Sequence, residues 1–423
     1  MSHLAAFMTE PTPAHYIEQH RSELLDLLAT LVRFDTTNPP GTNYDAITQH
    51  LVAEMQRAGL TAERLPIPRA ALETALPQDQ WDFPRFNVVG RREVAGATKT
   101  IHFNAHYDVV PVSGRWRHGD PFSGTVDDEA IYGRGTADMK GSIASLLMAL
   151  RALQETGVEP AVNIEVSFTA DEETDSVLGA DWLVHHAKIA PDYVVVMEGG
   201  EGRHVCCGHN GVTWLRVVVH GKAAHGSQPE HGINALEKMS ALVLALEGHK
   251  HDLATRTFTT PNGTVMRPTL NVGGVFGAGP GGKINTVPAE AHFTIDRRVL
   301  ATETVDAAEA ELRAVLDRTA ASIPDCRITI EKISENHACF NPPDNPFFKA
   351  MAESVTKVRG ETAEFSVSTG FNDMHFFSHH FQVPTLGYGP GGDQIHAVDE
   401  HARVRDLMDS AGIYADLLVK FAG

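Results

Sequence analysis

Strand-like and helical patterns alternate through the first half of this chain, and this alternation most restricts the folds it can adopt. Residues 163–169 alternate apolar and polar side chains, as in a strand with one buried face, whereas residues 193–197 form a continuous apolar run, as in a strand buried on both faces. Residues 141–156 repeat apolar side chains at helical spacing. Strands that alternate with helices predict an α/β fold with a mixed, largely parallel sheet flanked by helices.

The order of the expected elements changes after Gly211. Six segments follow in the order strand, helix, strand, strand, helix, strand, at residues 213–220, 233–246, 268–276, 290–299, 304–319 and 327–333. This is the order of a ferredoxin-like α+β domain. We therefore expect a first domain in two parts, residues 1–210 and 336–423, with an inserted domain at residues 211–335. Residues 66–84 contain four prolines and little periodicity, which predicts an irregular segment.

Acidic residues and histidines follow the ends of the expected strands. In an open α/β sheet, ligands bind outside the carboxyl ends of the parallel strands. The residues expected at this edge are His106, Asp108, Asp138, Glu172, Glu173, Glu198 and His396. Imidazole and carboxylate groups together suit Zn²⁺ and related divalent ions, and a carboxylate can bridge two of them. The pattern therefore predicts a site for two divalent metal ions.

The charge balance of such a site favours two ions. One bridging carboxylate, with one further carboxylate and one histidine for each ion, gives three negative charges. A bridging hydroxide adds a fourth, so that two dications make the site neutral. Without metal, the same buried carboxylates would each cost several kcal/mol through desolvation and mutual repulsion.

The overall charge restricts the possible partners. The 423 residues include 54 acidic and 35 basic side chains, a formal net charge of −19. Such a chain repels phosphate backbones and anionic lipids, so we expect no nucleic-acid or membrane partner. We find no signal peptide and no apolar stretch of about 20 residues. The four cysteines have no CxxC spacing. These observations predict a cytoplasmic protein.

Several motifs occur together along nearly the whole chain. They are Asn38-Pro39-Pro40-Gly41, His106-x-Asp108, Gly133 to Gly141 with Asp138, Glu172-Glu173, Glu198, Gly221 to Gly226, Asn285, Asp296, Arg298 and His396. In this combination the sequence resembles the metal-dependent acetylornithine deacetylase and succinyl-diaminopimelate desuccinylase family, which also contains aminoacylases and glutamate carboxypeptidases. The resemblance implies a binuclear metallohydrolase whose inserted domain serves as a lid and dimerisation domain.

At the metal site, the resemblance implies five ligands. Asp138 would bridge the two ions. His106 and Glu198 would bind one ion, and Glu173 and His396 would bind the other. The ions would be zinc, with cobalt or manganese as alternatives.

The resemblance also implies three residues with catalytic roles. Glu172 would be the general base that takes a proton from the attacking water and passes it to the leaving amine. Asp108 would fix the ring of the neighbouring histidine ligand. His225 would stabilise the oxyanion, unless it is a solvated loop histidine. A cis peptide bond between Asp138 and Met139 is implied as well.

Substrate binding would involve Arg298 and Asn285, which would hold a carboxylate of the substrate. Alternatively, Arg298 pairs with Asp296 on the surface of the sheet. His375 stands where the family commonly has an arginine that helps to bind this carboxylate, and we treat it as a substrate contact. Asp373, two residues earlier, is either a site residue or a helix cap.

The predicted function is hydrolysis of the amide bond of an N-acyl amino acid or a related small amide. A carboxypeptidase or dipeptidase is an alternative, and so is an enzyme that cleaves another C–N bond, such as that of an aryl amine or a carbamoyl group. A metal-binding sensor or scaffold is the alternative without catalysis, but it has no need for Glu172. The expected partners are a small-molecule substrate and a second copy of the chain in a homodimer.

Overall fold

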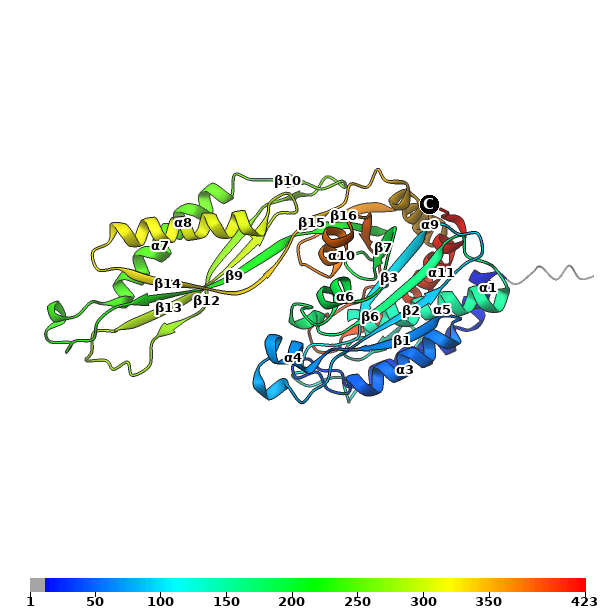
Figure 1. Ribbon diagram of the computed structural model, residues 1–423, viewed down its shortest axis with the longest axis horizontal. Coiled ribbons are helices and arrows are strands. Elements are labelled where there is room, and N and C mark those ends of the chain that lie inside the picture. Colours follow the sequence, from blue (N-terminus) through cyan, green and yellow to red (C-terminus); the bar gives the residue numbers. More distant parts are fainter. Residues whose placement is uncertain (1–11) are drawn as a thin grey trace, which may run out of the picture. The chain divides into compact units, whose positions relative to one another are not determined.

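The computed structural model describes residues 12–423, and the chain divides into two compact units (Figure 1). The first unit contains the described residues up to Cys207, together with Asn341–Ser366 and Asn372–Gly423. The second contains Gly208–Phe340 and Val367–Phe371. That residues 211–335 fold as a domain of their own stays a prediction.

Most strands of a nine-stranded sheet belong to the first unit, and the order of this sheet is β1-β2-β6-β3-β7-β17-β8-β15, with β16 paired to β8. Strands β6, β3, β7 and β17 run parallel to one another, and most of the flanking pairs are antiparallel. The strands are β1 (Thr61–Pro66), β2 (Phe86–Arg92), β3 (Thr100–His106), β6 (Asn163–Thr169), β7 (Tyr193–Val196), β8 (His204–His209), β15 (Cys339–Phe340), β16 (Glu364–Ser368) and β17 (Thr385–Gly387). The mixed sheet with a parallel centre confirms the predicted fold class.

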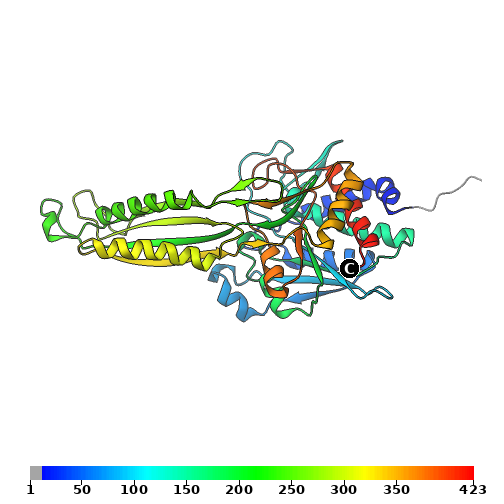
Figure 2. The same cartoon turned by 90° about the horizontal axis from the view of Figure 1, so that it is seen from above.

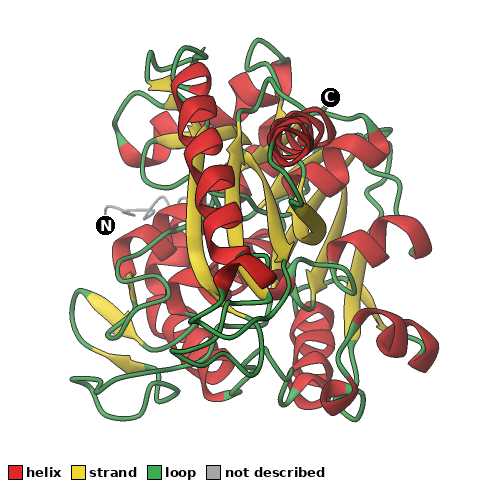
Figure 3. Ribbon diagram, turned by 90° about the vertical axis from the view of Figure 1, so that its left-hand side faces the viewer, coloured by secondary structure: helices red, strands yellow, loops and turns green. Residues whose placement is uncertain are grey.

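Helices flank this sheet (Figure 3). Helix α5 packs against α1, α2 and α11, while α10 packs against α6 and strands β7 and β17. The helices are α1 (Pro13–Gln19), α2 (Arg21–Arg33), α3 (Tyr44–Arg57), α4 (Arg69–Ala75), α5 (Gly141–Thr156), α6 (Ala180–His186), α9 (Pro346–Arg359), α10 (Met374–Phe381) and α11 (Val404–Lys420). A small sheet of β4 (Thr125–Val126), β5 (Ala130–Tyr132) and β18 (His401–Arg403) lies apart from the main one. Within residues 12–423, no helix has the length and apolarity to cross a membrane.

The prediction of an irregular segment at residues 66–84 is wrong in part. This segment contains helix α4 and follows strand β1, which pairs with β2. Leu72 of α4 is buried in a small cluster with Ile67 and Leu178. Because α4 has only seven residues, its one buried contact leaves too little periodicity to be recognised locally.

The second unit has the strand and helix order predicted for it. Four antiparallel strands form a sheet in the order β12-β13-β9-β14. Helices α7 and α8 lie on one face of this sheet (Figure 2). The elements are β9 (Gly211–His220), α7 (Ala235–Leu253), β12 (Thr269–Ala278), β13 (Glu290–Val299), α8 (Val305–Ser322) and β14 (Arg327–Asn336), with a hairpin of β10 (Phe258–Thr259) and β11 (Val265–Met266). This is the ferredoxin-like topology.

Candidate metal centre

Asp138 lies between the two histidines of the predicted site. Its Oδ1 is 3.1 Å from Nε2 of His106, and its Oδ2 is 3.1 Å from Nε2 of His396. The two oxygens of one carboxylate therefore face two different imidazole rings. A carboxylate that bridges two metal ions needs this arrangement.

Two glutamates extend the cluster on either side of Asp138. Oε2 of Glu173 is 3.1 Å from Nε2 of His396, and Oε2 of Glu198 is 3.8 Å from Nε2 of His106. Across residues 12–423, the other oxygen of each glutamate, Oε1, is buried without a hydrogen-bond partner. Such an oxygen is costly to bury, and a cation would supply the missing partner. The residues present therefore fit divalent metal ions.

Proton affinities in the cluster support this fit. Burial raises the pKa of Glu173 to about 7, and the negative charge of Asp138 adds to the rise. Burial and neighbouring carboxylates also hold the pKa values of Glu172 and Glu198 well above their usual range. Hydrogen bonds to Asp138 and Glu173 raise the pKa of His396 to about 10. The cluster thus attracts positive charge, which protons or metal cations can supply.

Each residue of the cluster comes from the carboxyl end of a strand or from a turn beside it. His106 is the last residue of β3, and Glu198 comes two residues after β7. Glu172 and Glu173 begin a short 3₁₀ turn directly after Asp171, which follows β6. Asp138 lies in the turn before α5. The peptide bond between Asp138 and Met139 is cis, as the family resemblance implies. His396 lies in the loop between β17 and β18.

Asp108 connects His106 with the turn that carries Glu172 and Glu173. Nδ1 of His106 donates to the main-chain oxygen of Asp108 at 3.0 Å and lies 3.4 Å from its carboxylate. The carboxylate accepts the main-chain N–H groups of Glu172 and Glu173, each at 3.2 Å. Asp108 is fully buried, so these bonds are shielded from water. It can therefore orient both segments.

Asp171 stabilises the same turn, a role that no sequence motif predicted. Its carboxylate accepts hydrogen bonds from Nε of Arg85 at 2.9 Å, the Tyr44 hydroxyl at 3.0 Å and Nδ2 of Asn38 at 3.0 Å. Its backbone adopts a left-handed conformation, with φ of 59°. The position of Asp171 directly before Glu172 could have indicated a role at the site. Nothing in the sequence near Arg85 indicates that Arg85 pairs with Asp171.

Asp373 and His375 lie at the start of α10. The Asp373 side chain makes no capping hydrogen bond and instead accepts the hydroxyl of Ser176. Nδ1 of His375 donates to the main-chain oxygen of Asn372 at 2.8 Å, and the ring is buried. Asp373 therefore does not cap the helix with its side chain, and its role as a site residue stays a prediction.

The remaining predicted residues belong to the second unit. His225 forms an isolated β-bridge with Thr286, and its Nδ1 is 2.7 Å from Oγ of Ser227. The Gly226 N–H next to it donates to the main-chain oxygen of Asn285 at 2.7 Å. These two contacts bring the segments of His225 and Asn285 together. Arg298 forms an ion pair with Asp296 at 2.9 Å, which is the alternative considered for it.

Comparison with known proteins places this geometry in a family. Residues 102–420 match the family described as Peptidase family M20/M25/M40. The chain belongs to this family. The predicted resemblance is therefore confirmed, and so is its implication that the chain is a metal-dependent hydrolase of amide bonds. The candidate ligand group of His106, Asp138 and Glu173, whose ligand atoms lie within 4.8 Å of one another, is consistent with that chemistry.

Relatives within the M20/M25/M40 family match most of the chain. A succinyl-diaminopimelate desuccinylase of Methylocella silvestris is 28% identical over 94% of this chain and 98% of its own length. An acetylornithine deacetylase of Aliivibrio fischeri is 31% identical over 74% of this chain and 79% of its own length. The M20 metallo-carboxypeptidase of Sulfolobus solfataricus shares the fold, with a TM-score of 0.76 and 21% identity over 94% of this chain and 98% of that one.

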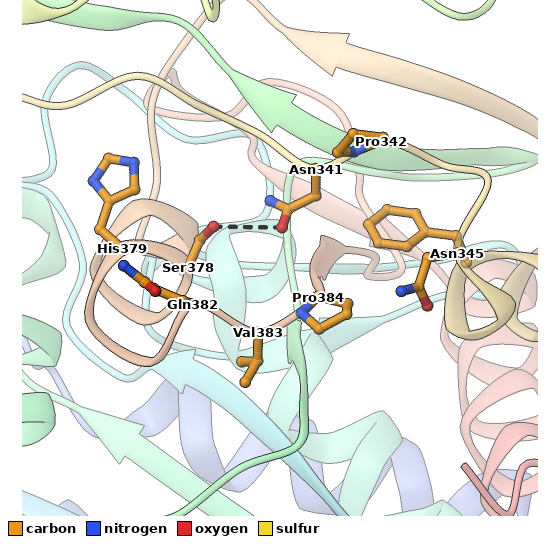
Figure 4. Close-up of a pocket in the computed structure, with 9 residues that line it drawn as sticks. Asn341, Pro342, Asn345, Ser378, His379, Gln382, Val383 and Pro384 are labelled. Carbon is orange, nitrogen blue, oxygen red and sulfur yellow. Dashed lines mark hydrogen bonds between the residues drawn. The ribbon is translucent and has the colours of Figure 1, made fainter.

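Two cavities of the first unit differ in chemistry. One of about 240 Å³ adjoins the candidate metal site, and Asp138, Glu198 and the glycines at positions 199, 200 and 391 are among the residues that line it. The other, of about 580 Å³, lies between the start of α9 and the end of α10 (Figure 4). Its lining consists of Asn341, Pro342, Asn345, Phe348, Ser378, His379, Gln382, Val383 and Pro384. It contains no carboxylate, so of these two cavities the smaller one adjoins groups that suit metal-dependent hydrolysis.

Proposed function

We propose that this chain hydrolyses the amide bond of N-acyl amino acids with two divalent metal ions. The observation that carries the proposal is the position of Asp138, whose two carboxylate oxygens each lie 3.1 Å from a different histidine. The relatives named as a desuccinylase and a deacetylase support the acyl amino acid as substrate.

Five residues would hold the metal ions, which we propose to be zinc, with cobalt or manganese as alternatives. Asp138 would bridge the ions, with His106 and Glu198 on one side. Glu173 and His396 would bind on the other side. When bound there, the ions would polarise the substrate carbonyl and lower the pKa of the attacking water.

Glu172 would transfer the protons of the reaction. Its carboxylate Oε2 is 3.8 Å from Nε2 of His106, beside the proposed ligands, which do not include Glu172. A base that takes a proton from water and returns it to the leaving amine needs a pKa near the working pH, and burial of Glu172 raises its pKa. Asp108 holds the main-chain N–H of Glu172 and so limits the movement of the base.

Four further residues would recognise the substrate. We propose that His225 stabilises the oxyanion and that Asn285 and Arg298 hold the substrate carboxylate. The adjacency of the His225 and Asn285 segments supports a shared role. Asp296 accepts from Nε and Nη2 of Arg298, and the outer edge of the guanidinium, with Nη1, would bind the substrate carboxylate. His375 would act from the start of α10. We also propose a cytoplasmic location, which four cysteine thiols support.

A substrate panel with defined metal content tests the function. We expect the metal-free protein to be inactive and Zn²⁺, Co²⁺ or Mn²⁺ to restore hydrolysis of N-acetyl or N-succinyl amino acids. Dipeptides and N-carbamoyl amino acids in the same panel separate the peptidase and carbamoyl alternatives. A protein that binds two metal ions tightly but hydrolyses none of these compounds would instead be a metal-binding sensor or scaffold.

A homodimer through the second unit is also proposed. Within residues 12–423, β12 pairs only with β13 and is therefore an edge strand, and it exposes Val275 and Phe276 by 62% and 71%. Exposed apolar residues on an open strand edge are typical of an interface.

We expect Phe276→Asp to convert the dimer to a monomer in light-scattering measurements, because a charge would be buried at the interface. Leu244→Asp is the matched control, since Leu244 is 72% exposed on helix α7. A protein that is monomeric before substitution contradicts the proposal, as does a Phe276→Asp dimer of unchanged stability.

A further inference from the structure

Glu400 is a buried carboxylate that binds the backbone of the turn carrying Asp138. Its Oε1 accepts the main-chain N–H groups of Gly135 and Ala137 at 3.0 Å and of Asp138 at 3.1 Å. Its Oε2 is bound by Nη1 of Arg134. Glu400 is fully buried and Arg134 is 2% exposed, so this group of contacts is closed to water.

The turn around Asp138 needs an external acceptor for these N–H groups. Asp138 and Met139 have non-helical backbone angles, with φ of −126° and −136°, inside a segment that leads into α5. Regular helical hydrogen bonding is therefore interrupted where three N–H groups converge. A carboxylate satisfies convergent N–H donors more strongly than a neutral acceptor does. The carboxylate of Glu400 accepts hydrogen bonds from all three of these N–H groups.

The same contacts reach the loop that carries His396. Glu400 comes four residues after His396, and Nη2 of Arg134 donates to the main-chain oxygen of Ala397 at 3.2 Å. In this loop Gln394, His396 and Asp399 are non-glycine residues with φ of 60° or 61°. Such left-handed residues persist only where surrounding contacts hold them. The Arg134–Glu400 pair thus joins the segments of two proposed ligands.

We propose that Glu400 is a positioning residue of the metal centre. It holds the two carboxylate oxygens of Asp138 toward both histidines by fixing the backbone of the Asp138 turn against the His396 loop. Glu400 acts through main-chain N–H groups and through Arg134. The inference rests on the proposed metal ligands.

The test compares two buried glutamates that each pair with arginine. Glu400→Gln removes the charge that attracts three N–H groups and a guanidinium. Glu54→Gln is the matched control, because Glu54 is 2% exposed and binds Arg57 and Arg151, with no contact to a ligand turn. We expect Glu400→Gln to weaken Zn²⁺ binding about 10- to 100-fold in competition with a chromophoric chelator, the range for residues that orient metal ligands. The visible spectrum of the Co²⁺-loaded protein should change as well.

If a variant is less stable than the original protein, its Zn²⁺ affinity still tests the proposal. Equal Zn²⁺ affinity in Glu400→Gln and the original protein would overturn the proposal, and so would an equal loss in Glu54→Gln. If Glu400→Gln does not fold, Arg134→Lys takes its place, because it keeps the positive charge but loses the bond to Ala397. We expect about 10-fold weaker Zn²⁺ binding for this variant, and unchanged binding would reject the role. Failure of the original protein to bind two Zn²⁺ ions would instead reject the proposed function.

Discussion

Glu172→Gln is expected to lower turnover about 10²- to 10⁴-fold, the usual contribution of a general base, while the protein keeps its metal ions. Glutamine has the shape of glutamate but cannot accept the proton from the attacking water. The proposed ligand set does not include Glu172, whose carboxylate lies 3.8 Å from the nearest ring nitrogen of His106. Steady-state kinetics on the best substrate of the panel, with metal analysis of the same sample, measure both effects.

The neighbouring residue provides the control for this experiment. Glu173→Gln changes the same group one position later, but Oε2 of Glu173 is 3.1 Å from Nε2 of His396, within the proposed ligand set. We expect this variant to lose metal as well as turnover, and excess metal should restore part of its activity. Excess metal should have no such effect on Glu172→Gln. Unchanged turnover in Glu172→Gln would remove its assignment as the base.

Asp138→Asn should have the largest effect on metal binding. The amide retains only one oxygen, and its nitrogen would face either His106 or His396, where the carboxylate now places an oxygen at 3.1 Å. We expect both ions to bind more than about 100-fold more weakly, beyond the loss caused by residues that merely orient ligands. Activity at micromolar metal should then be undetectable. Isothermal titration with Zn²⁺ measures the affinity and the stoichiometry.

Asp373→Asn is the matched control for Asp138→Asn. Asp373 is also buried and near the glutamate turn, but its carboxylate accepts the hydroxyl of Ser176 and contacts neither histidine. We expect it to bind two Zn²⁺ ions. If Asp138→Asn keeps two tightly bound ions, Asp138 does not bridge them.

Local patterns in the sequence were sufficient to predict strands that precede several of the proposed ligands. The alternating residues 163–169 and the apolar run at 193–197 correspond to β6 and β7. The neighbours of each strand bury its apolar side chains, so the pattern of apolar residues alone predicts both strands. The proposed ligands stand at the ends of such strands, and because parallel strands bring distant residues together there, their proximity could be predicted.

Long-range hydrogen bonds account for what could not be predicted. Arg85 and Asp171 are 86 positions apart, and Arg134 and Glu400 are 266 apart. No periodicity connects such residues, since each pair forms only after the sheet has assembled. Helix α4 could not be predicted for a related reason: it has seven residues, too few for a helical repeat to stand out.

The second unit lies between the ligands in the chain, and this determines when the metal centre can form during synthesis. His106, Asp138, Glu173 and Glu198 all precede Gly208, whereas His396 follows Phe340. At the usual rates of translation, the roughly 200 residues between Glu198 and His396 take about 10 to 40 s to produce. A growing chain would therefore present the proposed ligands of one ion well before those of the other are complete. Loading of the two ions would then be ordered in time, with the ion at His396 arriving last.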